Sequence, residues 1–409
     1  MRILITSPVF PPDLGGPAVY VPSLARYLVE RGHEVEVVAF CSDPEPRGHP
    51  FRVTAIARGP LPVRYLKAFA AVLRRARRAD VVYVNEHLAL LHVLAARLAR
   101  RPVVIRIMVD GAWEIAHRKG WIGGDDIVTF QAKDYGWQVK LVRALQRRWW
   151  GWSRRIIACS EFLRQIPIRR YGVPEEKVER IYNAYHGPTR EELRATAREA
   201  RAALGLEAEP RYLLTICRLM VWKGVDGILR AMPGLPEDVH LLVAGDGDML
   251  EPWKALAREL GLERRVRFLG NVPYERIPLL IRAADVFVLN SEYEGLSHTL
   301  LEVAALGAPI VCTDVCGNPE VVEHGRSGLL VPARDPPALR AAIARLLEDP
   351  GLRRELAEEA ARRMQRFSRE ETFPAVERVL AEAAGVSVPD ASPSGARAAM
   401  PATAKPGGR

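Results

Sequence analysis

Short runs of β-branched and other apolar residues alternate with longer amphipathic segments, and the alternation starts again after the middle of the chain. This pattern is typical of parallel β-sheets covered by helices. The first series of predicted strands is Arg2–Thr6, Glu34–Phe40, Arg52–Ile56, Asp80–Val84, Val103–Ile107 and Arg155–Cys159. The second series is Tyr212–Ile216, His240–Ala244, Val266–Phe268, Val286–Leu289 and Pro309–Cys312. The sequence therefore predicts an α/β fold with two Rossmann-like units.

At 409 residues the chain is longer than one hydrophobic core usually serves, so we expect two facing domains with a cleft between them. Ligands of such sheets bind at the carboxyl ends of the strands. The expected parts are an N-terminal domain (1–183), a linker (184–210), a C-terminal domain (211–367), a C-terminal helix that could pack back on the N-terminal domain (368–385) and a disordered tail (386–409). Within these parts, helices are expected at Thr189–Ala203, Pro336–Glu348 and Arg353–Phe367.

Composition narrows the class of protein. No segment approaches the ~20 apolar residues that span a bilayer, and the first residues read as a strand rather than a signal peptide. We therefore expect the chain to work in the cytoplasm, including at the inner face of the membrane. The five cysteines lack the spacing of a zinc site, so small buried thiols are expected.

The net charge of +10 is concentrated in places, above all between Lys140 and Arg170. That segment holds nine basic residues and one acid, with three tryptophans (Trp149, Trp150 and Trp152) among them. Basic segments with tryptophan are typical of contacts with membrane surfaces. A solvated amphipathic helix in an arginine-rich chain is the alternative that the residues leave open. No nucleic-acid-binding motif is present, so nucleic acid is not an expected partner.

Two loops after predicted strands suit phosphate binding. The first contains Gly15 and Gly16, whose backbone can approach a ligand closely, although a plain strand-to-helix turn would look the same. It lacks the GxGxxG pattern of dinucleotide-dependent oxidoreductases. The second contains Arg218 and Lys223, which together could neutralise a diphosphate on which charge builds as a bond to it breaks.

The segment Ser291–Ala305 carries the strongest signal. Ser297 is a good N-cap for an apolar helix at Thr299–Leu306, which would place Glu294 in the loop and Glu302 one turn into the helix. A carboxylate on so apolar a helix is costly unless it is paired or bound to a ligand. The free amides from Leu296 onward would form an anion site between the two glutamates.

Taken together these motifs resemble glycosyltransferase family 4, a group of retaining enzymes with two facing Rossmann-like domains known as the GT-B fold. The resemblance covers roughly residues 1–385. It rests on the Gly15-Gly16 loop, Arg218 with Lys223-Gly224, the Gly245-Asp246-Gly247 turn, Glu294 and Glu302 with seven residues between them, and Ile181-Tyr182-Asn183, which is similar to the family's Pro-Asn-Gly linker.

The resemblance implies transfer of a sugar from a nucleotide-sugar donor with its anomeric configuration kept. Arg218 and Lys223 would stabilise the departing diphosphate, and Glu294 would hold hydroxyls of the donor sugar. Glu302 would hold the nucleotide ribose. The other expected donor-binding residues are Gly15, Gly16, Gly245, Leu296 and Ser297 around the phosphates, and Gly270 and Val272 near the base.

One position departs from the family pattern. Many relatives carry a histidine after the fifth strand of the first domain, where this chain has Asp110. The surrounding residues resemble a subgroup with aspartate there, which implies that Asp110 orients an acceptor hydroxyl or accepts its proton. An aspartate that shapes the turn before Gly111 is the alternative. His87 and His117 are further candidates nearby.

No cofactor and no metal are expected, because Arg218 and Lys223 already supply positive charge. Asp246-Gly247-Asp248 spells a metal-binding Asp-x-Asp but lies in a glycine-rich turn without other carboxylates. The co-substrate could be UDP-, GDP- or ADP-linked. The acceptor could be a sugar, a lipid-linked molecule or a small metabolite, in polysaccharide, glycolipid or cell-envelope assembly. An epimerase or phosphorylase of the same architecture, or a non-catalytic sugar-nucleotide-binding protein, is the rival interpretation.

Overall fold

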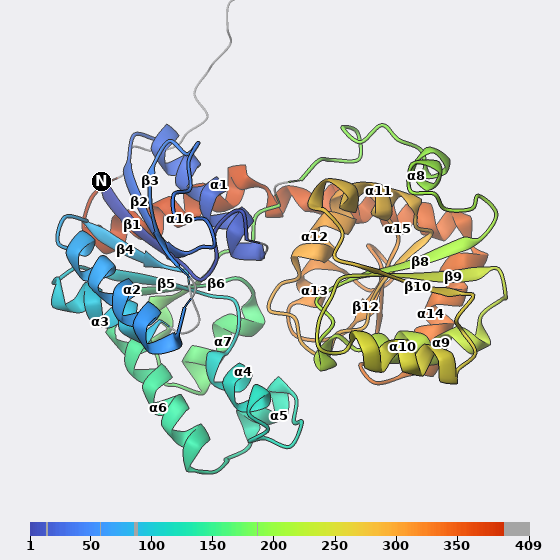
Figure 1. Cartoon of the computed structure of the whole chain (residues 1–409), viewed down its shortest axis with the longest axis horizontal. Helices are drawn as coiled ribbons and strands as arrows, with labels where there is room; N and C mark the ends of the chain where they lie inside the picture. The colour runs from blue at the N-terminus through green and yellow to red at the C-terminus, as the bar shows by residue number, and fades with distance from the viewer. Residues whose placement is uncertain (14, 58, 86–88, 186, 388–409) are drawn as a thin grey trace, which may run out of the picture.

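The computed structural model describes residues 1–387 except 14, 58, 86–88 and 186. Two parallel sheets, each covered by helices, lie side by side (Figure 1). Figure 1 also shows cyan and green helices of the first half below its sheet. The predicted α/β fold with two Rossmann-like domains is confirmed.

The first sheet has seven parallel strands in the order β3-β2-β1-β4-β5-β6-β7. Its strands are β1 (Arg2–Ser7), β2 (Glu34–Phe40), β3 (Arg52–Ile56), β4 (Val81–Val84), β5 (Val103–Ile107), β6 (Arg155–Ala158) and β7 (Val178–Arg180). The helices of this half are α1 (Gly16–Glu30), α2 (Leu61–Ala76), α3 (Leu90–Leu98), α4 (Gly111–Arg118), α5 (Ile127–Ala132), α6 (Trp137–Trp152) and α7 (Glu161–Arg169). Helices α2 and α3 cover one face, and α1 covers part of the other.

The second sheet has six parallel strands in the order β10-β9-β8-β11-β12-β13. Its strands are β8 (Arg211–Ile216), β9 (Val239–Ala244), β10 (Val266–Gly270), β11 (Val286–Leu289), β12 (Ile310–Thr313) and β13 (Leu329–Val331). The helices of this half are α8 (Ala197–Ala203), α9 (Val225–Ala231), α10 (Leu250–Glu259), α11 (Ile277–Ala283), α12 (His298–Ala305), α13 (Asn318–Val321), α14 (Pro336–Glu348) and α15 (Pro350–Arg362). Helices α9 and α14 pack together on one face, while α11 and α12 lie against the other.

The last helix, α16 (Arg369–Ala384), crosses back and packs on β4, β5 and β6 of the first sheet. Its Glu377 is buried and accepts hydrogen bonds from the Tyr27 hydroxyl at 2.9 Å and from Arg31. His33 Nε2 lies 2.7 Å from the same carboxylate. The chain therefore ties its C-terminal end to the first domain through a buried polar contact.

Several sequence expectations need correction. The predicted helix Thr189–Ala203 is wrong in its first half, because helix α8 begins at Ala197 after the capping box of Thr196 and Glu199. The predicted Arg353–Phe367 helix begins earlier, at Pro350, and its last turn is a 3₁₀ helix. Strands β7 and β13 were not expected, since three residues give too short a pattern to read.

Two of the three tryptophans of the basic segment are core residues. Trp149 and Trp150 are only 4% and 2% exposed, and both belong to the core under the first sheet. These two rings therefore take no part in the membrane contact expected for the segment 140–170, and the contact itself stays a prediction. The predicted tail 386–409 lies outside the described residues apart from Val386 and Ser387.

The carboxyl-end loops of the two sheets meet. A Cβ atom added to Gly295, which follows β11, would lie 2.2 Å from the Met108 carbonyl oxygen, which follows β5. Only glycine fits so close an approach of two backbones. The Tyr293 hydroxyl donates to the same carbonyl at 3.1 Å. The contact joins the two domains at the edge where doubly wound sheets bind ligands.

A buried arginine holds the connection between the domains. Arg106, on β5, donates to the carbonyl of Tyr182 at 3.1 Å and to the Asn183 side-chain oxygen at 2.9 Å. The Asn183 amide nitrogen donates in turn to the carbonyl of Leu296 at 3.1 Å. The expected linker motif at Asn183 therefore contacts both the first sheet and the Glu294–Glu302 segment directly.

Candidate functional site

A buried ion pair lies between the loops that follow β8 and β11. Lys223 Nζ is 2.6 Å from Glu294 Oε1, and the Ser291 hydroxyl donates to the same oxygen at 2.7 Å. The two charged side chains are 18% and 10% exposed. Two of the predicted site residues are thus in contact, and each charge is compensated by the other.

Gly224 explains why these loops come together. It adopts φ of +60°, which favours glycine, and a Cβ there would lie 2.2 Å from the Asn290 carbonyl oxygen. The Asn290 side-chain nitrogen donates to the Gly224 carbonyl at 2.8 Å. The glycine after Lys223 therefore allows the β8 loop to reach the β11 loop.

Arg218 belongs to the same loop as Lys223 but faces a separate hollow. This cavity, of about 600 Å³, lies between Arg218, Trp222 and the Asp246–Asp248 turn on one side and Glu114 and Arg118 on the other. Its walls come from both domains. Arg218 is exposed, so its guanidinium is available to an anionic ligand in the cavity.

A second cavity, of about 420 Å³, brings together four of the predicted donor-binding residues. Gly15 and Gly16 line it from the first domain, and Val272 and Glu302 line it from the second. The four residues come from three segments that lie far apart in the sequence. A larger hollow of about 820 Å³ lies at 185–192 and 358–370 and contains none of the predicted site residues.

Glu302 is a perturbed carboxyl group in this cavity. Burial raises the pKa of Glu302 to about 7, and a hydrogen bond with Tyr274 opposes part of that rise. The cost of burying a charge on an apolar helix is the reason that Glu302 was expected to be a site residue. Tyr274, the hydrogen-bond partner of Glu302, was not expected from the sequence.

His298 is a site residue that the sequence analysis missed. A Cβ atom on Gly16 would lie 3.3 Å from the His298 ring, so the glycine loop packs directly on the imidazole. Nε2 of His298 is buried and has no hydrogen-bond partner among the described residues. Burial, with Arg106 as a second cause, lowers the pKa of His298 to about 4. A neutral ring with a free nitrogen thus lines the cavity, one residue after the cap Ser297.

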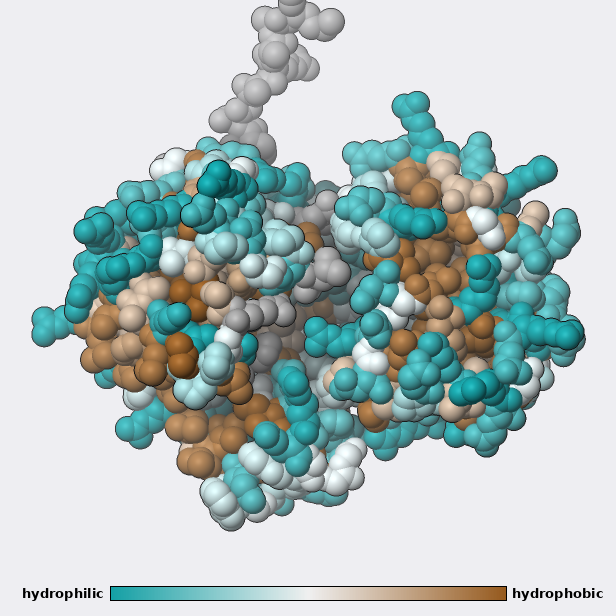
Figure 2. Space-filling view, in the orientation of Figure 1, coloured by the Kyte–Doolittle hydropathy of each residue, from teal (hydrophilic) through white to brown (hydrophobic). Residues whose placement is uncertain are grey.

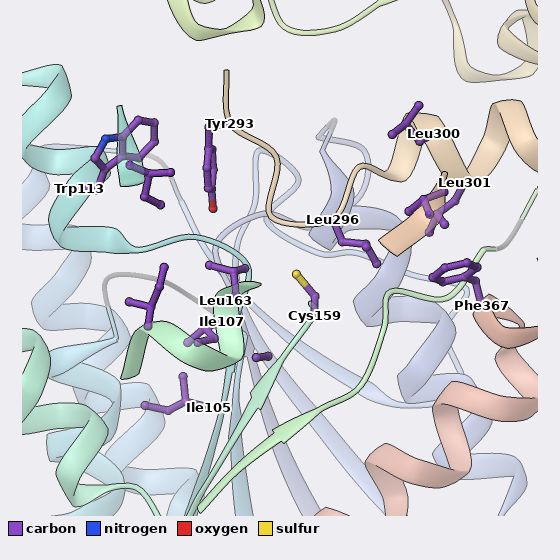
Figure 3. Packing of buried hydrophobic residues seen from close by; sticks show 14 of the residues in the cluster. Ile105, Ile107, Trp113, Cys159, Leu163, Tyr293, Leu296, Leu300, Leu301 and Phe367 are labelled. Atoms are coloured by element: carbon purple, nitrogen blue, oxygen red, sulfur yellow. The ribbon is translucent and has the colours of Figure 1, made fainter. Parts of the chain in front are cut away.

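The start of α12 is built as expected. The Ser297 hydroxyl accepts from the Leu300 amide at 3.3 Å, which makes Ser297 the N-cap. Leu296 is buried in the same core cluster as Cys159 of the first domain, and Figure 3 draws both residues. Tyr293, in the same loop, lies beside Trp113 with ring centroids 4.8 Å apart.

Gly245, which follows β9, and Gly270, at the end of β10, are in contact. The Gly245 amide donates to the Gly270 carbonyl at 2.8 Å. A Cβ on Gly245 would lie 1.9 Å from the Cys217 carbonyl oxygen, so the turn after β9 lies directly against the loop of Arg218. Gly245 therefore supports the loop packing and does not line either of the two cavities described above.

Asp110 is buried and fully engaged. Its carboxylate caps α4 by accepting from the Ala112 amide at 3.0 Å, and both oxygens accept from side chains. The side-chain donors are Gln146 and Gln131, each at 2.6 Å, and the Tyr171 hydroxyl at 3.3 Å. This geometry favours the turn-shaping role over a role with the acceptor proton.

The other histidine candidates differ in position. His117 stacks edge-on against Trp222, with ring centroids 5.2 Å apart, and burial lowers the pKa of His117. His87 lies outside the described residues. Within the described residues, no group of three or more His, Cys, Asp and Glu side chains could hold a metal ion.

Comparison with known proteins adds to this geometry. Residues 15–184 match the family model of the glycosyl transferase 4-like domain, and residues 196–363 match that of the glycosyl transferases group 1. Together the two models cover nearly all of both domains. The chain belongs to the GT-B glycosyltransferases.

Relatives match most of the length of this glycosyltransferase. An uncharacterized glycosyltransferase of Methanocaldococcus jannaschii is 28% identical over 86% of this chain and 90% of its own length. Glycogen synthase of Mycobacterium tuberculosis is 28% identical over 89% of this chain and 90% of its own. The structure of Anabaena HepE in complex with UDP and glucose has a TM-score of 0.74 at 23% identity, covering 93% of this chain and 100% of HepE.

The geometry around Asp110 predicts the effect of Asp110→Asn in the glycosyltransferase. The asparagine amide would place an N–H donor against side chains that already donate to Asp110. We therefore expect the free energy of unfolding to fall by about 1–3 kcal/mol. Urea unfolding measures this, with the same change at exposed Asp248 as the control. Unchanged stability together with lost turnover would contradict the structural role and favour the acceptor-proton role.

Glu302 predicts a pH-dependent stability. The pKa of Glu302 in the folded protein, about 7, exceeds the ordinary value of 4.5, so the native state holds this proton more tightly than the unfolded state does. The stability that protonated Glu302 contributes is therefore lost as the pH rises from 4.5 through 7. The melting temperature of the wild type should therefore fall relative to Glu302→Gln between about pH 5 and about pH 8. Melting curves that stay parallel over this range would show that Glu302 is not perturbed.

Proposed function

We propose that this glycosyltransferase moves a sugar from a nucleotide-sugar donor to an acceptor hydroxyl with retention of the anomeric configuration. The observation that carries the proposal is the Lys223–Glu294 pair, a buried cation and carboxylate at the edge where the two domains meet. HepE, which shares the fold, has been solved with UDP and with UDP-glucose. These complexes support a nucleoside diphosphate sugar as co-substrate.

The nucleoside would occupy the cavity between the glycine loop and α12. Glu302 would accept hydrogen bonds from the ribose, and Val272, after the Gly270 turn, would lie near the base. Burial has raised the pKa of Glu302 because it removes the water that would solvate the carboxylate. The hydroxyls of a bound ribose would donate hydrogen bonds in place of that water. UDP-, GDP- and ADP-linked donors all carry this ribose.

The diphosphate would extend from that cavity toward Lys223. Gly15 and Gly16 would let it approach the first domain, and the backbone of Leu296 and Ser297 at the start of α12 would face it from the other side. Arg218 and Lys223 would then balance the charge that develops on the leaving group. The two cations replace the role that a divalent metal has in other transferases, so we propose a metal-independent reaction.

Glu294 would hold hydroxyls of the donor sugar. In the structure its Oε1 already accepts from Lys223 and Ser291, which fixes the carboxylate in place before a donor binds. The acceptor oxygen would attack the anomeric carbon as the bond from that carbon to the phosphate oxygen breaks. The departing phosphate oxygen would take the acceptor proton, and attack on the same face would retain the configuration.

The acceptor side belongs to the first domain. We propose an acceptor used in polysaccharide, glycolipid or cell-envelope assembly, with the enzyme at the inner face of the membrane. Within the described ranges, no helix combines the length and the apolar character needed to cross a membrane.

The role of Lys223 can be tested by Lys223→Ala. Loss of the charge that stabilises the leaving diphosphate should lower kcat by about 100-fold or more, and it should also weaken binding of the nucleoside diphosphate, which carries that charge. Steady-state kinetics with the preferred donor and calorimetry with its nucleoside diphosphate measure the two quantities. Lys254→Ala, on the outer helix α10, is the matched control and should leave both unchanged. Near-normal kcat for Lys223→Ala would remove this residue from catalysis.

A further inference from the structure

Three neighbouring helices on the outside of the first domain contain no acidic residue. Helix α3 packs between α2 and α6, and these helices are 16, 9 and 16 residues long. None of them has an aspartate or a glutamate, whereas α10 and α15 of the second domain carry several. We call the outer surface of α2, α3 and α6 the basic face.

Basic side chains on this face point to solvent. The exposed ones are Lys67 and Arg74 on α2, Arg97 on α3, and Lys140, Arg147 and Arg148 on α6. Acidic groups around its edges already have cationic partners: Glu36 pairs with Arg75, Asp80 with Arg2, and Asp134 with Arg170. The face therefore keeps a net positive charge.

Large apolar side chains are exposed on the same face. Trp137, Leu141 and Leu145 follow one another at four-residue intervals on α6, so they lie on one side of the helix. Trp137 is 71% exposed, and Leu66 on α2 is 65% exposed. Figure 2 shows hydrophobic residues gathered on the side of the first domain where Figure 1 places α2, α3 and α6. A soluble surface rarely exposes such a cluster without a partner.

The charge pattern identifies the partner. Two copies of this face would place like charges opposite one another, which disfavours self-association. A nucleic acid would match the charge but offers its backbone no apolar contact for the leucines and the tryptophan. A lipid surface with anionic headgroups satisfies both, since lysine and arginine can reach the headgroups while the apolar side chains enter the acyl boundary.

We propose that the basic face, α2, α3 and α6, docks the enzyme on an anionic membrane surface. One consequence of docking rests on the proposed function: a lipid-linked acceptor would be presented to the first domain. Docking itself requires no donor and no acceptor. The basic face includes the exposed part of the segment 140–170 expected from the sequence and adds α2 and α3, whereas Trp149 and Trp150 are buried and take no part in it.

The experiment is co-sedimentation of the full chain with vesicles, without any nucleotide. Vesicles of phosphatidylcholine alone are compared with vesicles of equal parts phosphatidylcholine and phosphatidylglycerol. The wild type should bind the anionic vesicles and not the neutral ones. Lys67→Glu combined with Lys140→Glu should weaken binding at least tenfold, since each cation near such a surface contributes about 1 kcal/mol. Leu66→Gln combined with Leu141→Gln should also weaken it, at unchanged net charge.

The matched control is Arg258→Glu combined with Arg354→Glu, which makes the same change in net charge on exposed positions of α10 and α15. It should bind vesicles like the wild type, and thermal melting should show all variants folded. Absence of binding to anionic vesicles by the wild type, or an equal loss in the control, would overturn the proposal. So would a dimer in solution that the α2 and α6 changes dissociate. None of these outcomes bears on nucleotide-sugar transfer, which the Lys223→Ala kinetics test separately.

Discussion

The close approach of two backbones, at Gly295 and Met108, is the contact on which the arrangement of the site depends. No side chain fits between them, since a Cβ on Gly295 would meet the Met108 carbonyl at 2.2 Å. The contact brings the carboxyl-end loops of two parallel sheets to a common edge. Glu294 precedes Gly295 in the loop after β11, so its ion pair with Lys223, which comes from the loop after β8, lies at this edge. The buried Arg106 fixes the connecting chain beside it.

Two chemical environments result at this edge. Around Lys223 and Glu294, buried charges compensate each other and stay fixed, as a site that must stabilise developing charge requires. Around Glu302, a carboxyl group lies in a cavity lined by apolar groups and prefers its proton near neutral pH. A nucleotide with a diphosphate has a polar ribose at one end and charge at the other. The cavity at Glu302 suits the ribose, and the charged pair suits the diphosphate.

Local patterns in the sequence predicted the local features of the structure. The β-branched runs gave most strands to within one or two residues, and Ser297 was recognised as a helix cap. Features set by distant contacts were not accessible. The hydrogen bonds to Asp110 come from Gln146 and Tyr171, far along the chain, and the burial of Trp149 depends on how α6 packs. The expected helix from Thr189 was too long because charged residues with high helix propensity do not form a helix without a surface to pack on.

The central claim is sugar transfer from a nucleotide donor with retention. The most direct measurement incubates the enzyme with UDP-, GDP- and ADP-linked sugars in turn, without added acceptor, and follows the products by proton NMR. Water then takes the place of the acceptor. The account predicts that one of the donors releases its nucleoside diphosphate and that the free sugar first appears in the anomeric configuration of the donor. A sugar that first appears inverted, or an enzyme that cleaves none of the donors, would contradict it.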